Sequence, residues 1–427
     1  MRVLVLGGGA REHALVARLA AERDVGELDA APGNPGIRRL ARALPIDLSD
    51  PEAIRSLAER EQIDFTIAGP ELPLAAGVAD RFADDGRLLF GPTKAAACLE
   101  SSKAFAKSFM DRHAVPTARF RVCESLDEAL DTVRRGEFGL PLVLKADGLA
   151  AGKGVVIAAD RHEAERAIVE AMRDRKFGAA GDRIVIEECL TGPEVSFFAI
   201  SDGVRAVPIG TAQDHKRIFD DDRGPNTGGL GAFAPSPLVD AALEARVMRE
   251  IINPVIAGMA AEQCPFRGFL FAGLMLTVDG PKVIEFNVRL GDPEAQVVLP
   301  LIDEPLLPLL VAAAMGSLTV PSVRRGSDRL AGVVLASRGY PEPSESGQPI
   351  TGIEAAEAMA DVAVYHAGTA ERAGRLVTAG GRVLTVVGRG GTFRDAITRA
   401  YAGAMQVSFD GMQFRRDIGQ RAVKYDV

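Results

Sequence analysis

The chain has 427 residues, of which 47% are hydrophobic and 25% are charged. These fractions are typical of a soluble globular protein, and the length is enough for about three domains. The formal net charge of −8 argues against a general nucleic-acid-binding protein. No run approaches the roughly 20 apolar residues that a membrane-spanning helix needs.

The N-terminus and the cysteines favour a cytoplasmic protein. Residues 1–6 read as a strand and have neither the length nor the flanks of a signal peptide. Cys98, Cys123, Cys189 and Cys264 have neither metal-binding nor redox-motif spacing. We therefore expect reduced thiols and no zinc site.

Residues 1–100 alternate between strand and helix patterns, which predicts a doubly wound parallel sheet. The expected strands are residues 3–6, 28–31, 43–46, 65–68 and 88–90, with helices that include 14–22 and 51–60. Ligands of such sheets bind beyond the carboxyl ends of the strands. Three turns are expected at that edge: residues 7–9, 32–36 and 69–71.

The turn Gly7-Gly8-Gly9 precedes a helix, where backbone N–H groups favour an anion. A dinucleotide fingerprint would place a third glycine at position 12, which is Glu12 here. Arg11 and His13 add cationic or hydrogen-bonding groups. The turn therefore fits a small phosphate ester better than a dinucleotide, although a tightly packed turn without a ligand is the alternative.

From about residue 101 the pattern changes to strands joined mostly by short turns, which indicates an antiparallel α+β core. A helix is expected at residues 103–113 and another near 243–260. The expected strands are residues 142–146, 154–158, 184–189, 194–200, 204–209, 269–278 and 282–288.

Residues 145–154, Lys-Ala-Asp-Gly-Leu-Ala-Ala-Gly-Lys-Gly, form a glycine-rich turn that differs from a P-loop in its spacing. Such a hairpin can cover phosphates with backbone donors, and Lys145 can reach them as a point charge. A flexible surface hairpin is the alternative. Further along, Glu187 and Glu188 end an apolar strand and must point to opposite faces; one is a candidate contact for adenine or ribose.

Residues 213–217, Gln-Asp-His-Lys-Arg, and 220–231 form a dense polar loop between apolar strands. It offers both signs of charge, which suits a small zwitterion and a transferring phosphoryl group. A long solvated loop is the alternative, but loops of this length are usually functional or disordered.

Residues 283–289 read as a strand in which Glu285, Asn287 and Arg289 share one face. A carboxylate and an amide oxygen suit Mg²⁺ that is also bound by phosphates, and the arginine can neutralise phosphate charge. An amphipathic strand with a wet face is the alternative. A linker is expected at 320–327, followed by a small α+β unit with strands near 330–337, 362–366 and 383–387 and a helix at 392–405.

In combination these motifs resemble those of the phosphoribosylamine–glycine ligase family, which belongs to the ATP-grasp superfamily. The resemblance covers essentially the whole chain. It is carried by Arg-Glu-His-Ala-Leu at 11–15, the stretch 145–154, Gln-Asp-His-Lys-Arg at 213–217 and Gly-Pro-Asn-Thr-Gly-Gly at 224–229. It implies an N-terminal substrate-binding domain at 1–100, an ATP-grasp domain at 101–320 with a lid subdomain at about 120–190, and a C-terminal α+β domain at 328–427.

The resemblance also implies the reaction and its participants. Glycine, 5-phosphoribosylamine and ATP would be the substrates, glycyl phosphate the intermediate, and glycinamide ribonucleotide, ADP and phosphate the products, in purine synthesis. Mg²⁺, with Mn²⁺ as a substitute, would be the metal. We expect a monomer, with neither a nucleic acid nor a membrane as a partner.

Site residues follow from the same resemblance. The metal ligands would be Glu285 and Asn287, and the catalytic group would be Arg289, Lys216 and Asp214. ATP would be bound by Lys103, Lys145, Gly152, Lys153, Gly154, Glu187, Glu188, Leu190 and Glu194. The phosphoribosylamine and glycine sites would be lined by Gly9, Arg11, Gly33, Asn34, Glu71 and Asp292.

Three alternatives remain at this stage. A different ATP-grasp carboxylate–amine ligase or carboxylase would share the Glu285, Asn287 and Arg289 site but not the motifs at 11–15 and 213–217. A dinucleotide-dependent oxidoreductase would fit the first βα unit, but Glu12 counts against it. A non-catalytic nucleotide sensor would not need the predicted metal ligands.

Overall fold

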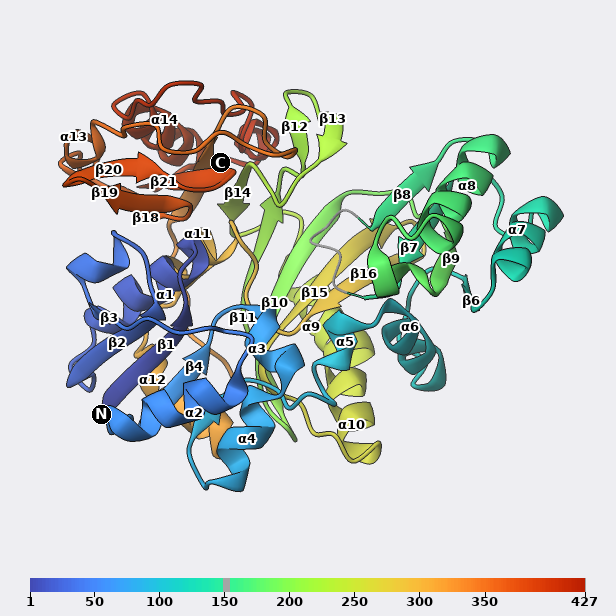
Figure 1. Ribbon diagram of the computed structural model, residues 1–427, viewed down its shortest axis with the longest axis horizontal. Coiled ribbons are helices and arrows are strands. Elements are labelled where there is room, and N and C mark those ends of the chain that lie inside the picture. Colours follow the sequence, from blue (N-terminus) through green and yellow to red (C-terminus); the bar gives the residue numbers. More distant parts are fainter. Residues whose placement is uncertain (149–153, 427) are drawn as a thin grey trace.

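The computed structural model describes residues 1–148 and 154–426, and Figure 1 shows their arrangement. The N-terminal residues form a five-stranded parallel sheet in the order β3-β2-β1-β4-β5. Its strands are β1 (Arg2–Gly7), β2 (Glu27–Pro32), β3 (Arg42–Ala43), β4 (Phe65–Ala68) and β5 (Leu89–Phe90). Its helices are α1 (Ala10–Ala20), α2 (Pro51–Arg60), α3 (Glu71–Ala76) and α4 (Val78–Asp84). The predicted doubly wound sheet is confirmed.

Two boundaries in this sheet differ from the prediction. The third strand ends at Ala43 rather than residue 46, and Pro45 has no N–H with which to extend a ladder. Helix α1 begins at Ala10 rather than residue 14, because Glu12 caps it by accepting a hydrogen bond from Gly9 N at 2.7 Å.

The centre of the molecule is an antiparallel eight-stranded sheet in the order β16-β15-β10-β11-β14-β17-β21-β18. Five strands come from the region predicted as ATP-grasp: β10 (Glu194–Asp202), β11 (Ala206–Asp214), β14 (Gly231–Ala234), β15 (Arg267–Thr277) and β16 (Gly280–Asn287). Three come from the C-terminal region: β17 (Arg329–Ala336), β18 (Val362–His366) and β21 (Arg382–Gly390). The two regions therefore share one sheet through the β14–β17 pair.

Helices pack around this sheet and join it to the N-terminal unit. They are α5 (Cys98–Ser101), α6 (Lys103–Arg112), α9 (Ala241–Val247), α10 (Asn253–Ala261), α11 (Ala295–Val298), α12 (Leu306–Ala314), α13 (Ile353–Glu357) and α14 (Phe393–Ala404). One core cluster contains Val5 of β1, Phe198 of β10 and Val387 of β21. The N-terminal sheet, the central sheet and the C-terminal strands thus share apolar packing.

A third sheet projects from the body at the right of Figure 1. Its order is β6-β9-β7-β8, from β6 (Phe120–Cys123), β7 (Leu142–Ala146), β8 (Val155–Ala158) and β9 (Ile184–Glu188), covered by α7 (Leu126–Arg135) and α8 (Arg161–Ile168). It has its own apolar cluster, which includes Leu144, Ile168 and Ile186. We call this unit, residues 120–188 as far as they are described, the lid.

The polar loop predicted at residues 220–231 contains a hairpin. Strands β12 (Arg217–Phe219) and β13 (Arg223–Asn226) pair antiparallel, with Arg217 opposite Asn226. The predicted loop is therefore interrupted by β13, and its partner β12 lies just before the loop. A second small hairpin, β19 (Thr369–Arg372) with β20 (Arg375–Thr378), lies in the C-terminal region.

Candidate active site

The three glycine turns of the N-terminal sheet meet around the buried carboxylate Glu12. A Cβ at Gly69 would lie 2.5 Å from Glu12 Cγ, and a Cβ at Gly8 would lie 2.6 Å from the carbonyl oxygen of Gly33. Side chains do not fit at these contacts, so glycine is required there. The expected convergence of the turns at this edge is confirmed.

Arg11 is a buried cation at the same edge. Its Nε donates to Glu12 Oε1 at 2.5 Å, and its Nη1 donates to the Leu290 carbonyl at 3.1 Å. Burial opposes the charge, but Glu12, Glu71 and Asp292 outweigh burial and raise the pKa of Arg11 above its ordinary value. The predicted phosphate turn therefore has a permanent positive charge beside it.

Asn34 has a structural role as well as the predicted place in the site. Its Nδ2 donates to the carbonyls of Gly8 at 2.9 Å and His366 at 2.7 Å, and its Oδ1 accepts a hydrogen bond from Ile37 N. The side chain is 4% exposed. It ties the first glycine turn to the C-terminal region, so a ligand would meet the main chain of residues 33 and 34 rather than this amide.

Arg289 lies where the N-terminal unit meets the central sheet. Its Nε donates to Glu71 Oε2 at 3.1 Å and its Nη2 donates to Glu100 Oε1 at 2.7 Å. Strand β16 ends at Asn287, so the prediction that the strand reaches residue 289 was wrong. The reason is that Val288 N donates to the Glu100 carboxylate, at 2.8 Å, instead of to a neighbouring strand.

Lys145, at the end of β7, points to a buried carboxylate. Its Nζ lies 3.0 Å from Glu187 Oε1 and donates to the Ile284 carbonyl at 2.9 Å. Lys107 Nζ of α6 lies 2.9 Å from the other oxygen, Glu187 Oε2. Burial lowers the pKa of Lys107 to about 8. One carboxylate therefore lies between two lysines, at the junction of lid and body.

The neighbouring acid, Glu188, points the other way, as predicted from the alternation of a strand. It pairs with Arg119, with Nε 2.8 Å from Glu188 Oε2. Both carboxylates of the expected adenine-reading segment are thus already engaged by the protein. Leu190 follows this strand, and its carbonyl accepts a contact from the Cys189 thiol.

Lys103 and the ends of the glycine-rich turn lie on the body side of the lid. Lys103 Nζ donates to the Gly148 carbonyl at 2.7 Å, and burial lowers the pKa of Lys103. Ala146 N donates to the Gly154 carbonyl at 2.8 Å, which closes the base of the β7–β8 hairpin. The predicted phosphate contacts Gly152 and Lys153 lie outside the described residues.

Lys216 is the cation of the predicted glycine site. Its Nζ lies 2.7 Å from Glu194 Oε2. Burial opposes its charge, but Asp214, Glu194 and Glu285 outweigh it, and the pKa of Lys216 is well above its ordinary value. Burial raises the pKa of Asp214 above its ordinary value, and the opposing effect of Lys216 is smaller. The predicted ribose contact Glu194 therefore has Lys216 as its partner in this structure.

The predicted metal ligands fit a cation that is shared with phosphates. Burial raises the pKa of Glu285, but Lys216, Lys145, Lys103 and Arg289 outweigh it and keep the carboxylate ionised. Asn287 is 8% exposed. Its amide oxygen is the atom that suits a metal, whereas its Nδ2 is a donor without a hydrogen-bond partner within residues 1–148 and 154–426. Over the same residues no cluster of three His, Cys, Asp or Glu could hold a metal alone. One carboxylate and one amide oxygen leave most positions of a magnesium ion for phosphate oxygens and water.

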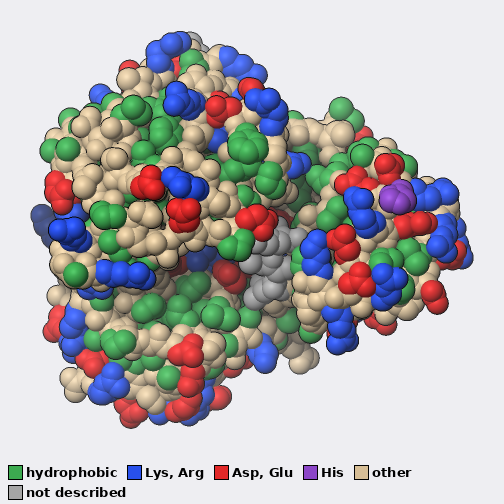
Figure 2. Space-filling model, turned by 45° about the horizontal axis from the view of Figure 1, so that its top comes forward, with side chains coloured by type: hydrophobic (Ala, Val, Ile, Leu, Met, Phe, Trp, Pro, Cys, Tyr) green, Lys and Arg blue, Asp and Glu red, His purple; other side chains and the backbone are tan. Residues whose placement is uncertain are grey.

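Asp292 lies where the N-terminal unit, the central region and the C-terminal region meet. Gln296 Nε2 donates to Asp292 Oδ1 at 2.7 Å, and Arg382 Nη2 of the C-terminal region lies 3.3 Å from Asp292 Oδ2. A Cβ at Gly9 would lie 3.7 Å from the same Oδ2. The Asp292 carboxylate thus faces the phosphate turn. On the molecular surface, Figure 2 shows a groove across one face of the molecule with acidic and basic side chains at its margins.

Three family models match the chain in succession. They describe the N domain of phosphoribosylglycinamide synthetase at residues 1–100, its ATP-grasp (A) domain at 101–295 and its C domain at 330–421. The chain belongs to the phosphoribosylamine–glycine ligase family.

Relatives along the full length agree with this assignment. Phosphoribosylamine–glycine ligase of Xylella fastidiosa (strain Temecula1) is 49% identical over 427 residues, covering 99% of this chain and 98% of the relative. That of Mesorhizobium japonicum is 48% identical over 423 residues, covering 99% of each. The crystal structure of phosphoribosylamine–glycine ligase from Thermotoga maritima has a TM-score of 0.83 and 34% identity, covering 98% of this chain and 100% of that one.

More distant structures share the fold alone. Biotin carboxylase from Campylobacter jejuni has a TM-score of 0.73 at 16% identity, covering 97% of this chain and 93% of that one. The predictions of an ATP-dependent ligase with the three-part architecture of the phosphoribosylamine–glycine ligase family are therefore confirmed. The ATP-grasp fold implies the use of ATP with a divalent metal.

Four residues of this phosphoribosylamine–glycine ligase family member belong to the site but were not predicted from the sequence. They are Lys107, Glu100, Glu294 and Arg382. Burial, and then Asp214, raise the pKa of Glu294 to about 7. The sequence carried one usable signal, since Lys107 follows Lys103 by four residues and shares its helix face. The partners of the other three are distant in the chain.

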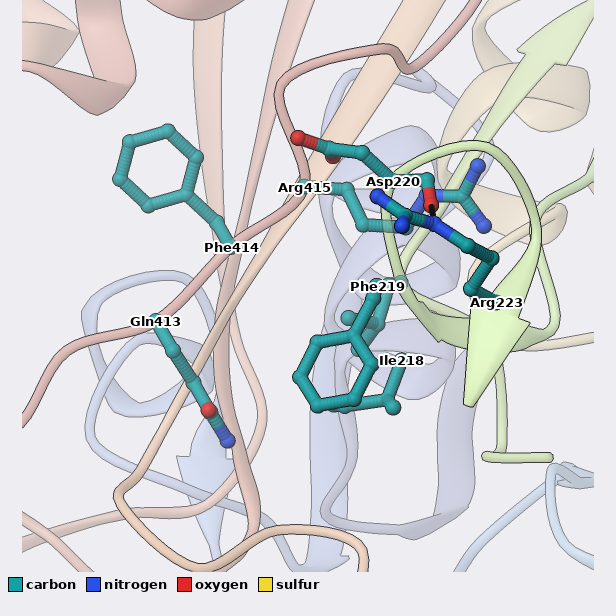
Figure 3. Close-up of a pocket in the computed structure, with 8 residues that line it drawn as sticks. Ile218, Phe219, Asp220, Arg223, Gln413, Phe414 and Arg415 are labelled. Carbon is teal, nitrogen blue, oxygen red and sulfur yellow. Dashed lines mark hydrogen bonds between the residues drawn. The ribbon is translucent and has the colours of Figure 1, made fainter. Parts of the chain in front are cut away.

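A cavity of about 530 Å³ lies outside this constellation, between the β12–β13 hairpin and the segment 413–415 (Figure 3). Its lining is Ile218, Phe219, Asp220, Arg223, Leu230, Gln413, Phe414 and Arg415. Arg415 is 2% exposed and ties the hairpin to the C-terminal region through Asp222 at 2.7 Å.

No helix among the described residues is long and apolar enough to cross a membrane.

Proposed function

We propose that the chain joins glycine to 5-phosphoribosylamine through glycyl phosphate. A glycine carboxylate oxygen attacks the γ-phosphorus of ATP, the bond to the bridging oxygen breaks, and ADP leaves. The amine nitrogen of phosphoribosylamine then attacks the acyl carbon, the C–N bond forms, the nitrogen loses a proton and phosphate leaves. The supporting observation is that a residue of the predicted phosphoryl site, Arg289, contacts a residue of the predicted phosphoribosylamine site, Glu71.

For ATP, Lys103, Lys145 and the turn Gly152-Lys153-Gly154 bind the phosphates. Because the carboxylates of Glu187 and Glu188 are paired with Lys145 and Arg119, the segment from Glu187 to Leu190 reads adenine through its main chain. Glu194 accepts the ribose hydroxyls, and in doing so exchanges its contact with Lys216. These roles follow from the family resemblance and, for the residues that the structure describes, are supported by the placement of the side chains.

Glu285 and Asn287 hold the metal, which we propose to be Mg²⁺ with Mn²⁺ as a substitute. When bound, the metal neutralises phosphate charge during phosphoryl transfer. Arg289 stabilises the same charge from the other side, which requires it to give up part of its pairing with Glu71 and Glu100. The cost of that exchange is lowest when the incoming phosphate offers charge-assisted bonds of equal strength.

The substrates occupy the two ends of this site. Lys216 and Asp214 bind glycine, since a zwitterion needs one cation and one anion. The phosphate and ribose of phosphoribosylamine bind at Gly9, Arg11, Gly33, Asn34 and Glu71, with Asp292 beside the amine. We further propose a cytoplasmic monomer that needs neither a nucleic acid nor a membrane.

The deciding experiment measures phosphate release from Mg·ATP with glycine and freshly generated phosphoribosylamine, omitting each in turn. We expect release to require all three and glycinamide ribonucleotide to form in a 1:1 ratio with ADP. Full activity with bicarbonate or another amino acid instead of glycine would assign the chain to a different ATP-grasp ligase. Activity that persists without phosphoribosylamine would contradict the second anion site.

A further inference from the structure

Two side chains of the C-terminal region, Tyr340 and Arg382, hydrogen-bond to the N–H and the carbonyl of Gly228, which follows β13. Gly228 N donates to Tyr340 Oη at 2.8 Å, and the Gly228 carbonyl accepts a hydrogen bond from Arg382 Nη1 at 2.6 Å. Arg382 is the first residue of β21, and Tyr340 lies in the turn that follows β17, so both come from the C-terminal region. The peptide groups on both sides of Gly228 are therefore fixed from outside the ATP-grasp motif.

The position of Gly228 also constrains the backbone of Lys216. Thr227 precedes the held glycine, and its N and Oγ1 both donate to the Lys216 carbonyl, at 2.7 and 2.8 Å. Gly229 N in turn donates to Thr227 Oγ1 at 3.0 Å. A shift of the turn at 227–229 would therefore move the backbone that carries the cation of the glycine site.

The same guanidinium also fixes Asp292. Arg382 Nη1 donates to the Asp292 carbonyl at 2.5 Å, and Nη2 lies 3.3 Å from its carboxylate. Arg382, Arg11 and a hydrogen bond from Gln296 overcome the effect of burial and lower the pKa of Asp292. One arginine thus links Asp292, which faces the phosphate turn, to the turn that orients Lys216.

We propose that Arg382, assisted by Tyr340, is a positioning residue that sets the distance between the acyl phosphate and the incoming amine. This inference rests on the proposed function and deepens it by assigning the C-terminal region a role in the second chemical step. A planar guanidinium with several fixed donors can bridge two carbonyls and a carboxylate, which a lysine cannot do. Misplacement of reacting groups by about 1 Å can cost on the order of 100-fold in rate.

The expected signature is loss of coupling rather than loss of nucleotide binding. When the amine is misplaced, water attacks the acyl carbon of glycyl phosphate, the acyl C–O bond breaks, and glycine and phosphate are released without product. The ratio of ADP to glycinamide ribonucleotide then rises above one. The KM for ATP changes little, because the side chains of Arg382 and Tyr340 bond to residues 228, 229 and 292, none of which is a proposed ATP contact.

The test compares Arg382→Ala, Arg382→Lys and Tyr340→Phe with the control Arg375→Ala. Arg375 is exposed at the start of β20, and within the described residues its side chain makes neither a hydrogen bond nor an ion pair. We expect a fall in k_cat of about 10- to 100-fold with an ADP-to-product ratio of at least about two for Arg382→Ala. Arg382→Lys should restore part of the coupling, Tyr340→Phe should show a smaller loss, and the control should keep a ratio of one.

Hydrogen exchange at residues 227–231 supplies a readout that does not depend on activity. It should quicken in Arg382→Lys and Tyr340→Phe and stay at the wild-type rate in Arg375→Ala. Wild-type coupling and exchange in both variants, or a change confined to the K_M for ATP, would overturn the positioning role. A wild-type protein that makes no product from glycine and phosphoribosylamine would overturn the proposed function instead, while the exchange comparison would still decide whether Arg382 and Tyr340 hold the turn.

Discussion

Arg289 and Glu71 form an ion pair, with Nε 3.1 Å from Oε2, that joins the end of the central sheet to the N-terminal unit. The side chain of Arg289 is 17% exposed and that of Glu71 is 36% exposed. The sequence placed these residues in different sites, one for phosphoryl transfer and one for the phosphorylated amine. Their contact means that occupation of one site changes the charge seen by the other.

The first prediction distinguishes the role of Arg289 from that of Glu71. Arg289→Ala should lower turnover at least about 100-fold, because it removes charge stabilisation at the phosphoryl group. Glu71→Gln should instead raise the K_M for phosphoribosylamine about tenfold, with little change in the K_M for ATP. Steady-state kinetics with each substrate varied gives the comparison, with the exposed Glu59→Gln as control. A Glu71→Gln variant impaired only toward ATP would show that Glu71 belongs to the nucleotide site.

The second prediction concerns the metal. Glu285→Gln removes the single carboxylate of the predicted ligand pair and should reduce turnover by about 100-fold or more. The fold should be retained, since the substitution keeps the size and shape of the side chain. Turnover at increasing Mg²⁺, together with a thermal melt, checks both parts. Asp279→Asn, at the exposed turn between β15 and β16, is the matched control; normal turnover in a folded Glu285→Gln protein would remove this residue from the metal site.

The third prediction follows from the separate core of the lid. Because the lid has its own apolar cluster and meets the body through polar contacts such as Glu187 with Lys107 of α6 and Lys145 with the Ile284 carbonyl, it is expected to move as a unit and close on nucleotide. Hydrogen exchange at β7 and β8 should slow when Mg·ATP is added. Exchange at β1, in the core of the N-terminal sheet, should not change. Equal exchange of β7 and β8 with and without nucleotide would argue against a closing lid.

The fourth prediction concerns Lys107. Lys107→Met leaves Glu187 with Lys145 alone, so Lys145 should be drawn to the carboxylate and contribute less to phosphate binding. We expect the K_M for ATP to rise about tenfold, a loss of about 1.4 kcal/mol. We also expect a loss of about 1.5–3 kcal/mol in the free energy of unfolding, as for a hydrogen bond to a charged group. Lys176→Met, on the lid surface, is the control; an unchanged K_M for ATP in Lys107→Met would mean that Lys145 does not depend on this pairing.

Local patterns predicted most of the fold. Short, largely apolar runs between turn and helix signals located β4 and β7 at their observed bounds, and helix α2 was predicted at its full extent because Asp50 and Pro51 mark its start. The alternation of side chains along a strand placed Glu187 and Glu188 on opposite faces. These features depend on neighbours in the chain, so the sequence contains what is needed to find them.

The unpredicted features depend on pairing between distant segments. The contact of Arg382 with Asp292 spans 90 positions, and that of Arg289 with Glu71 spans 218. No local pattern marks Arg382 as a site residue, since surface arginines are common. Arg289 was placed in the site from the alternation of residues 283–289, but nothing near it in the sequence indicates that Glu71 is its partner. The end of β16 was mistaken for the same reason, because the partner that diverts Val288 is Glu100, 188 positions away.

The last prediction concerns acid stability and three buried histidines. Burial lowers the pKa of His13 to about 3, of His215 to about 3 and of His366 to about 4, from an ordinary value of 6.5. His13 Nδ1 accepts a hydrogen bond from His366 N at 2.8 Å, which requires that nitrogen to be unprotonated and links the N-terminal unit to the C-terminal region.

In the folded state these imidazoles stay neutral at pH 5, whereas in the unfolded chain they take up protons below pH 6.5. Unfolding therefore binds protons, and each histidine lowers the free energy of unfolding by up to about 1.4 kcal/mol per pH unit as the pH falls from 6.5 toward 4. Glu294 acts in the opposite sense, because its raised pKa makes the folded state bind a proton below about pH 7. Urea unfolding of wild type and His366→Gln at several pH values between 6.5 and 5 isolates one histidine. The free energy of unfolding of His366→Gln should fall less steeply with falling pH than that of wild type, by the slope that corresponds to about one bound proton. The slope of His162→Gln, on the exposed face of α8, should equal that of wild type. Equal slopes in all three proteins would show that His366 is not held neutral by the fold.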